Sequence, residues 1–253
     1  MEFQNLIVDT STEVATLTLH RPDSLNALTL GMMHELETAA TLIAGSDART
    51  VVVSGAGRSF CAGVDITALG ELGTASSDED TYEAFRLGGR MADKLEGLPQ
   101  VTVAALHGHV VGGGLILAAV CDLRVAASDT MFAIPEIDLG IPYGWGGIDR
   151  LVREIGPART KEYVMTGRPF SADEALAAGF INRVVEPDDV VRVAHSLAAT
   201  IASKTNVAVK VTKSHVAEVL GGDHSRDDAR SAVDALRDAE GAAARSAYLQ
   251  SND

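Results

Sequence analysis

The sequence predicts an α/β fold in which a β/α core precedes a helical region. Short β-branched segments alternate with amphipathic helix patterns over most of the 253 residues. Beyond Pro187 the pattern is almost wholly helical, from Asp188 to about Leu249. Hydrophobic residues make up 46% of the chain, which is enough for a sizeable core. We therefore expect a core over residues 1–195 and a C-terminal helical region over residues 196–253.

The first unit of the expected core is two strands, a helix and a third strand. Residues 3–10 and 14–20 alternate as a hairpin does, and the second strand stops at Arg21-Pro22-Asp23. Residues 28–45 carry apolar side chains at helical spacing, and residues 50–55, TVVVSG, predict the next strand.

A similar order continues through the middle of the chain. Residues 71–80 are small, polar and acidic, which predicts a mobile loop, and residues 82–98 predict a helix. Residues 101–108 predict a buried strand, and a short helix over residues 115–121 follows three glycines. Further strands are predicted over residues 123–127, 130–134 and 180–186, and a helix with a Ser171 cap and a Gly179 stop lies between the last two.

Charge and cysteine content exclude several classes of partner. The formal net charge of −14 repels polyanions, so we expect no nucleic-acid partner. The longest apolar run, Val110 to Cys121, falls short of the roughly 20 residues that span a bilayer, so no membrane contact is expected. Two cysteines cannot form a disulfide framework, and the start of the chain lacks a secretory pattern, which predicts a cytoplasmic location.

The run Gly112-Gly113-Gly114 is the first candidate for chemistry. No glycine in the sequence precedes a lysine, which excludes a P-loop. The glycines at 55 and 57 begin a dinucleotide fingerprint that fails at Phe60. Two interpretations of the triple glycine remain open: close backbone packing, or free N–H groups that face a developing negative charge.

Glu136 is the strongest candidate side chain, because Ile134, Pro135 and Ile137 surround it with apolar groups. A carboxylate in that setting has a raised pKa suited to proton transfer, unless it pairs at the surface. Tyr143 and Trp145 either line an apolar pocket or pack in the core.

Other candidates are weaker. His107 and His109 have no third ligand at metal-site spacing, so we expect no metal, and Cys61 is interpreted as a small buried residue.

Six segments together resemble the enoyl-CoA hydratase/isomerase (crotonase) superfamily across nearly the whole chain. They are HRPDSLNAL (20–28), GRSFCAGVDI (57–66), AALHGHVVGGG (104–114), CDLRVAA (121–127), FAIPEIDLGI (132–141) and TGRPFSADEALAAGFINRVV (166–185). The resemblance implies a crotonase-like spiral of ββα turns, with C-terminal helices that build a homotrimer or a dimer of trimers. It also implies an acyl-CoA thioester substrate and no separate cofactor, since coenzyme A is part of the substrate.

The resemblance further implies which residues meet the substrate. The backbone N–H groups of Ala62 and Gly113 would form an oxyanion hole, and two such fixed donors stabilise an enolate without reorganising. The loop around Asp23, Ser24, Leu25 and Ala27 would hold the adenine end. The remaining expected substrate contacts are Gly63, Val64, Asp65, Ile66, Gly112, Ile116, Pro135, Tyr143, Gly144 and Trp145.

The predicted reaction depends on a glutamate that is missing. Family hydratases carry two glutamates; one corresponds to Glu136, and the position of the other holds Ile116. One base beside an enolate hole suffices to shift a double bond, which predicts conversion of 3-enoyl-CoA to 2-enoyl-CoA. The alternatives are hydration, thioester hydrolysis or ring isomerisation on the same fold, and a non-enzymatic trimer that binds acyl-CoA or RNA.

Overall fold

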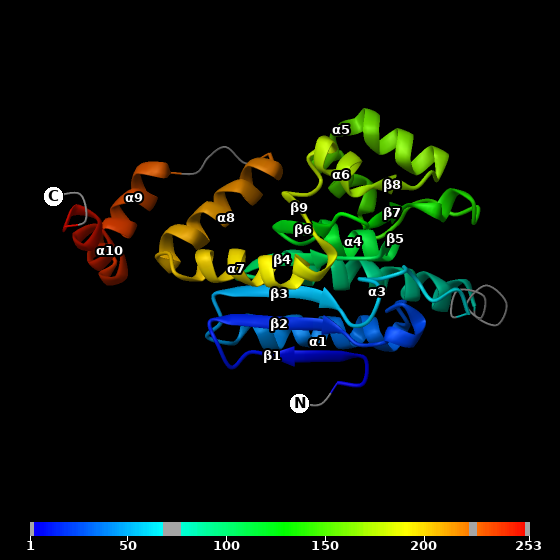
Figure 1. Cartoon of the computed structure of the whole chain (residues 1–253), viewed down its shortest axis with the longest axis horizontal. Helices are drawn as coiled ribbons and strands as arrows, with labels where there is room; N and C mark the ends of the chain where they lie inside the picture. Colours follow the sequence, from blue (N-terminus) through cyan, green and yellow to red (C-terminus); the bar gives the residue numbers. More distant parts are fainter. Residues whose placement is uncertain (1–2, 68–76, 223–226, 251–253) are drawn as a thin grey trace.

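The computed structural model describes residues 3–67, 77–222 and 227–250, and within them two sheets organise the fold (Figure 1). The larger sheet contains, in spatial order, β1 (Leu6–Asp9), β2 (Val14–Leu19), β3 (Thr50–Gly55), β4 (Val101–Leu106), β6 (Leu123–Ala127) and β9 (Arg183–Val185). The smaller sheet contains β5 (His109–Val111), β7 (Met131–Ala133) and β8 (Phe170–Ser171). β1 and β2 form the predicted antiparallel hairpin, and each later neighbour in the larger sheet is parallel. The mixed α/β architecture is confirmed.

Helices cover both faces of the larger sheet, so its central strands are buried on both sides and are mostly apolar. Every residue of β4 is buried. α7 (Val190–Ala202) covers one face through Val190, Ala194 and Ala198. On the other face the main core includes side chains of α1 (Leu30–Ala44), α3 (Asp78–Glu96) and α4 (Gly113–Ala119).

Side-chain caps set the starts of two helices differently from the prediction. α1 begins at Leu30 rather than at residue 28, because the Thr29 hydroxyl accepts from the N–H of Met32. α3 begins at Asp78 rather than at residue 82, because Ser77 and Asp80 form a reciprocal capping box. The predicted loop over 71–80 is therefore wrong for residues 78–80, and residues 71–76 lie outside the described residues.

The predicted strand over residues 101–108 is two elements. β4 ends at Leu106, Gly108 turns the chain with a φ of +57°, and β5 begins at His109. The helix predicted over 115–121 begins two residues earlier, at Gly113, and the strand predicted over 180–186 is limited to Arg183–Val185. Consecutive ββα turns result, of which β6, β7 and α5 (Gly147–Thr166) form one.

The C-terminal part of the chain is helical, as predicted. α6 (Ala172–Ala178) has its Ser171 cap and Gly179 stop, and the short 3-10 turn Pro187–Asp189 leads into α7. Of the remaining helices, α8 (Asn206–Leu220) contacts β4, whereas α9 (Asp228–Arg237) and α10 (Ala239–Gln250) lie at one end of the molecule (Figure 1). The expected boundary at residue 195 lies inside α7. Within the described residues, no helix combines the length and apolar composition needed to cross a bilayer.

Candidate active site

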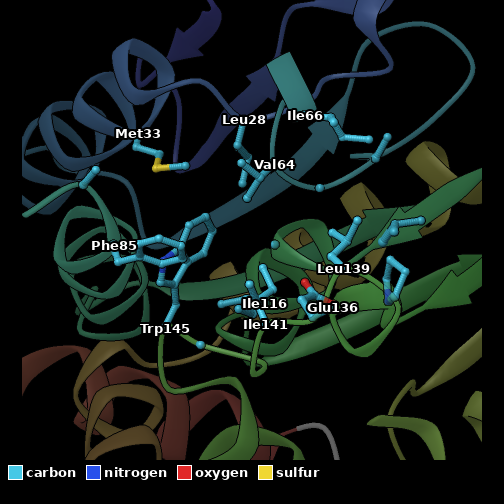
Figure 2. Close-up of a pocket in the computed structure, with 18 of the residues that line it drawn as sticks. Leu28, Met33, Val64, Ile66, Phe85, Ile116, Glu136, Leu139, Ile141 and Trp145 are labelled. Atoms are coloured by element: carbon cyan, nitrogen blue, oxygen red, sulfur yellow. The ribbon is translucent and has the colours of Figure 1, made fainter. Parts of the chain in front are cut away.

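One apolar pocket collects most of the residues singled out in the sequence (Figure 2). Its cavity has a volume of about 190 Å³ and lies between α1, α3, the start of α4 and the loop after Glu136. The pocket is lined by Leu28, Leu30, Met33, Ala62, Gly63, Val64, Ile66, Ala84, Phe85, Val111, Gly112, Gly113, Ile116, Pro135, Glu136, Leu139, Ile141, Pro142, Gly144 and Trp145.

Glu136 supplies the one carboxylate among these lining residues. It lies in the 3-10 turn Pro135–Ile137, which follows β7. Its Oε2 atom is buried and has no hydrogen-bond partner among the described residues. Burial raises the pKa of the carboxyl above its ordinary value. An unpaired carboxylate of raised basicity in an apolar cavity is suited to accept a proton from carbon.

Among the backbone N–H groups at the pocket that have no acceptor in the described residues are those of Val64 and Gly113. Leu28 donates to Gly63 O at 2.7 Å and accepts from the N–H of Asp65 at 2.9 Å. Because successive N–H groups of an extended strand point to opposite sides, the N–H of Val64 points away from Leu28. Gly113, the first residue of α4, also has an N–H without a partner.

These two segments lie close together. A Cβ placed on Gly63 would be 3.7 Å from the nitrogen of Gly113. The N–H groups of Val64 and Gly113 therefore flank one region of the pocket, where both can donate to an anionic oxygen.

Ala62 does not offer the free donor that the resemblance implied. Its N–H donates to the carbonyl of Leu25 at 3.0 Å, so it is already paired within the protein. The N–H of Val64, two residues later, has no acceptor among the described residues.

The glycine run provides the close backbone packing that the sequence left open, and the N–H of Gly113 has no acceptor among the described residues. A Cβ on Gly114 would lie 2.3 Å from the carbonyl oxygen of Cys61, so this position requires close backbone packing. Gly112 has a φ of +49° and a ψ of −113°, a conformation that glycine adopts readily. A Cβ there would lie 2.4 Å from Glu136 Oε1, so the carboxylate is packed directly against the glycine backbone.

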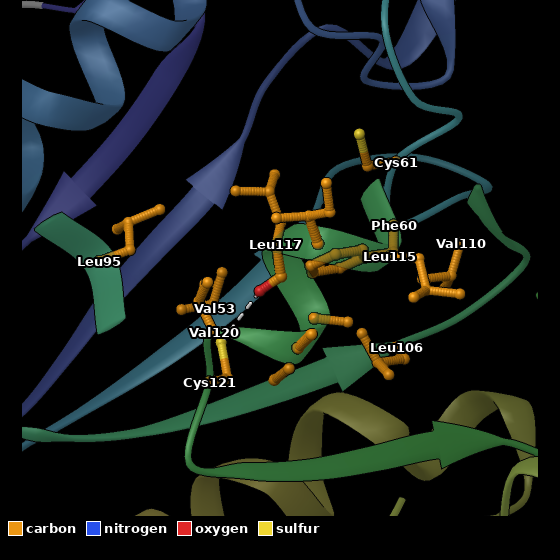
Figure 3. Close-up of a cluster of buried hydrophobic side chains, with 14 of the residues drawn as sticks. Val53, Phe60, Cys61, Leu95, Leu106, Val110, Leu115, Leu117, Val120 and Cys121 are labelled. Atoms are coloured by element: carbon orange, nitrogen blue, oxygen red, sulfur yellow. Dashed lines mark hydrogen bonds between the residues drawn. The ribbon is translucent and has the colours of Figure 1, made fainter. Parts of the chain in front are cut away.

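The helix that follows the glycines is buried, and Figure 3 shows the apolar cluster around it. Cys121 donates its thiol to the carbonyl of Leu117 at 3.4 Å, and Cys61 donates to that of Asn26 at 3.1 Å. Burial raises the pKa of each thiol to about 12. Both cysteines are therefore protonated core residues, which confirms the interpretation of Cys61.

Trp145 closes the pocket on the side of α3. Its ring occupies the space beside Gly88 and Gly113, since a Cβ on either glycine would lie 2.0 Å or 2.8 Å from the indole. Its carbonyl accepts from Arg150 at 2.7 Å, and this buried arginine pairs with Glu96 of α3 at 2.6 Å. The indole is thereby held over the start of α4.

Tyr143 is buried behind the pocket rather than in its wall. Only 6% of the residue is exposed, and its hydroxyl donates to the carbonyl of Gly112 at 3.2 Å. A Cβ on Gly147 would lie 2.4 Å from the Tyr143 ring, so the ring packs against the first turn of α5.

The other residues predicted to meet the substrate lie outside the pocket lining. Asp23 and Ser24 are exposed in the 3-10 turn Pro22–Ser24, and Leu25 and Ala27 follow it. This loop contacts the pocket edge through the bond between Leu25 and Ala62 described above. Asp65 forms an ion pair with Arg21 at 3.3 Å.

Several pocket residues were not predicted. They are Leu28, Leu30, Met33, Ala84, Phe85, Val111, Leu139, Ile141 and Pro142. Phe85 carried a usable signal, because it continues the buried side of the helix, three residues before Gly88, and is itself partly exposed. A large apolar side chain left exposed at the end of a core-facing stripe indicates a second contact. Leu139, half-exposed beside Glu136, has the same character.

Known proteins are similar to this chain along most of its length. A family model described as enoyl-CoA hydratase/isomerase matches residues 9–235. A short-chain-enoyl-CoA hydratase of Clostridium acetobutylicum is 37% identical over 215 residues, which are 84% of this chain and 81% of that protein. A solved enoyl-CoA hydratase from Bacillus anthracis is 33% identical, with a TM-score of 0.81 over 90% of this chain and 86% of its own. One from Mycobacterium smegmatis is 29% identical, with a TM-score of 0.85 over 98% and 97% of the two chains.

Proposed function

This chain belongs to the enoyl-CoA hydratase/isomerase family, and we propose that within it the protein shifts a double bond, converting a 3-enoyl-CoA to a 2-enoyl-CoA. The observation that carries the proposal is the unpaired carboxylate of Glu136, in a pocket where no other lining side chain of the described residues carries an acid or base.

The proposed chemistry is one proton removed and one returned. Glu136 takes the proton from C2 of the 3-enoyl thioester, and the electron pair delocalises over C2, C4 and the thioester oxygen. The N–H groups of Val64 and Gly113 donate to that oxygen as its charge builds up. Glu136 then returns the proton to C4, which leaves the double bond between C2 and C3.

Ile116 is the reason to favour this reaction over hydration. It lines the same pocket as Glu136 (Figure 2) and is 2% exposed, so it supplies apolar surface where a second acid or base would be needed. Hydration requires a water molecule to be activated beside C3 while a proton reaches C2. An aliphatic side chain neither orients nor deprotonates that water.

Hydration is the second candidate, because relatives more than 30% identical over most of the chain carry that name. Besides the clostridial protein, a crotonyl-CoA hydratase of Syntrophomonas wolfei is 34% identical over 89% of this chain. Glu136 acting alone, or with a carboxylate from another loop, would be the residue for this reaction.

Parallel assays with 2-enoyl-CoA and 3-enoyl-CoA substrates of several lengths separate the two reactions. We expect loss of the 3-enoyl substrate with formation of its 2-enoyl isomer, and little hydration. A kcat/KM for hydration that exceeds the value for isomerisation would contradict the proposal.

The variant Ile116→Glu tests the assignment of this position. We expect it to gain measurable hydratase activity, because it adds a second carboxylate to the pocket that contains Glu136. Ile116→Leu is the matched control, since it keeps an apolar side chain of equal volume and should gain none. A folded Ile116→Glu variant without hydration would argue against the role given to this position.

The remaining predictions concern binding and assembly. The loop of Asp23, Ser24, Leu25 and Ala27 stays the expected adenine site, since it adjoins the pocket edge through Leu25. A homotrimer stays the expected assembly, and it is supported by exposed apolar side chains on the C-terminal helices. These are Val216, Val219, Leu220, Val233 and Leu236.

A further inference from the structure

The carbonyl of Gly112 and the N–H of Gly113 are parts of one planar peptide group. Resonance keeps the two bonds in the same plane and pointing in opposite directions. A contact that fixes the carbonyl therefore fixes the direction of the N–H, which is a free donor at the pocket.

Three donors hold this carbonyl. The N–H groups of Leu115 and Ile116 donate to it at 2.9 Å and 3.1 Å, as backbone in the first turn of a helix does. The third donor is the Tyr143 hydroxyl at 3.2 Å, from a loop that no helix geometry requires to be there. The Tyr143 hydroxyl is therefore an extra hydrogen-bond donor to a carbonyl that already accepts two backbone hydrogen bonds.

We propose that Tyr143 is a positioning residue, whose hydroxyl orients and polarises the Gly112–Gly113 peptide so that its N–H donates more strongly to the thioester oxygen. This inference rests on the proposed function, because it assumes that the Gly113 N–H meets that oxygen. A donor on an amide oxygen draws electron density from the amide nitrogen, and such chains strengthen each bond by roughly 10–30%. Preorganised donors stabilise developing charge without reorganising during the reaction.

The surroundings keep this hydroxyl in the donor role. Burial, and secondly the charge of Glu136, raise the pKa of Tyr143 well above its usual range, so the hydroxyl keeps its proton. The hydroxyl donates to Gly112 and not to Glu136, whose Oε2 has no partner. A donor on the carboxylate would lower its basicity, whereas a donor on the peptide leaves the base free.

Tyr143→Phe tests this role because it removes only the hydroxyl. We expect kcat to fall about 3- to 10-fold, the effect of one neutral hydrogen bond, while KM stays nearly constant. Infrared difference spectra of bound [1-13C]butyryl-CoA supply the direct measurement. The thioester carbonyl stretch should be lowered on binding to the wild type and less lowered in the variant.

Tyr163→Phe is the matched control. Tyr163 is also buried, with 4% exposure, but its ring stacks on Phe170 at 4.1 Å and does not line the pocket. We expect this variant to leave both kcat and the carbonyl stretch at their wild-type values.

A second variant, which changes the donor strength of the hydroxyl without removing it, covers the case in which Tyr143→Phe fails to fold. Incorporation of 3-fluorotyrosine at position 143 keeps the ring and makes the hydroxyl a stronger donor, so the carbonyl stretch should fall below the wild-type value. One outcome is that the wild type lowers the carbonyl stretch of the bound ligand and both variants lower it by the same amount. The role of Tyr143 is then overturned, and the proposed function stands. If the wild type itself leaves the stretch unchanged, the donor pair of the proposed function is overturned, and this inference with it.

Discussion

Two parts of the pocket lining are built in opposite ways. One part of the lining, the glycine wall, is backbone and consists of Gly63, Gly112 and Gly113. Another part, the side-chain wall, consists of Phe85, Leu139, Ile141 and Trp145, and Gly144 precedes Trp145 in the chain. A Cβ on any residue of the glycine wall would lie 2.9 Å or less from another atom, whereas a Cβ on Gly144 would meet nothing within 4 Å.

This difference separates two requirements of the proposed reaction. Donors to a developing charge must be fixed within a fraction of an ångström, and backbone packed without side chains provides that. An apolar acyl group needs only a surface of suitable shape, which side chains from several elements provide. We therefore expect changes to the glycine wall and to Glu136 beside it to reduce the rate, and changes to the side-chain wall to alter selectivity.

Glu136→Gln is expected to have the largest effect, a loss of kcat of about 10²- to 10⁴-fold, because it removes the proton acceptor and keeps the shape. Isomerase assays measure the rate, and calorimetric titration with a saturated acyl-CoA should show nearly unchanged binding. Near-normal activity in this variant would sink the assignment of the base.

Gly114→Ala, next to the glycine wall in the chain, compared with Gly144→Ala, next to Trp145 of the side-chain wall, tests the contrast between the walls. The first variant places a methyl group against the Cys61 carbonyl, and overpacking of this kind lowers the free energy of unfolding by roughly 1–3 kcal/mol. We expect a fall in kcat as well, since the Gly113 N–H moves with the backbone. Gly144→Ala should change neither quantity. Urea unfolding and steady-state assays measure the two quantities. Equal stability and equal kcat in the two variants would contradict the difference between the two walls.

Gly88→Ala and Gly89→Ala test the packing of Trp145 on neighbouring residues of α3. A Cβ on Gly88 would overlap the indole at 2.0 Å, whereas one on Gly89 meets nothing within 4 Å. Gly89→Ala should stabilise the helix by about 0.5–1 kcal/mol, and Gly88→Ala should destabilise the protein.

In a Trp145→Ala background, Gly88→Ala should become stabilising too, and the preferred acyl chain should lengthen. Thermal unfolding and a chain-length series measure the two effects. A penalty for Gly88→Ala that persists without the indole would show that the clash lies elsewhere.

The smallest expected effect is a pH dependence of stability. The folded state favours the neutral form of Glu136, since burial raises its pKa above the ordinary value of 4.5. The free energy of unfolding of the wild type therefore falls as pH rises from 4.5 through the raised pKa, and Glu136→Gln removes this fall. Over that pH window, the Tm of the wild type should therefore fall relative to the Tm of Glu136→Gln. The acid limb of kcat/KM should likewise lie above pH 4.5, and a limb below it would contradict the raised pKa.

Local pattern was sufficient to identify the central residues of the site. Glu136 was identified because apolar neighbours surround it, and the glycine run because a strand precedes it and a helix follows. The N–H of Ala62 was misjudged, since sequence shows which residues are near a site and not which acceptor each N–H meets. Phe85 and Met33 were missed because they approach the pocket from helices distant in the chain.

The sequence by itself determined the α/β class, the order of most elements, the family resemblance and the isolated glutamate. These follow from periodicity, turn residues and the charge of single side chains, which are local properties. Only the tertiary structure decided that Val64 rather than Ala62 has a free N–H, that Tyr143 supports Gly112, and that Trp145 covers two glycines. Each of these depends on contacts between distant segments, where a shift of one or two residues decides whether a group is paired or free.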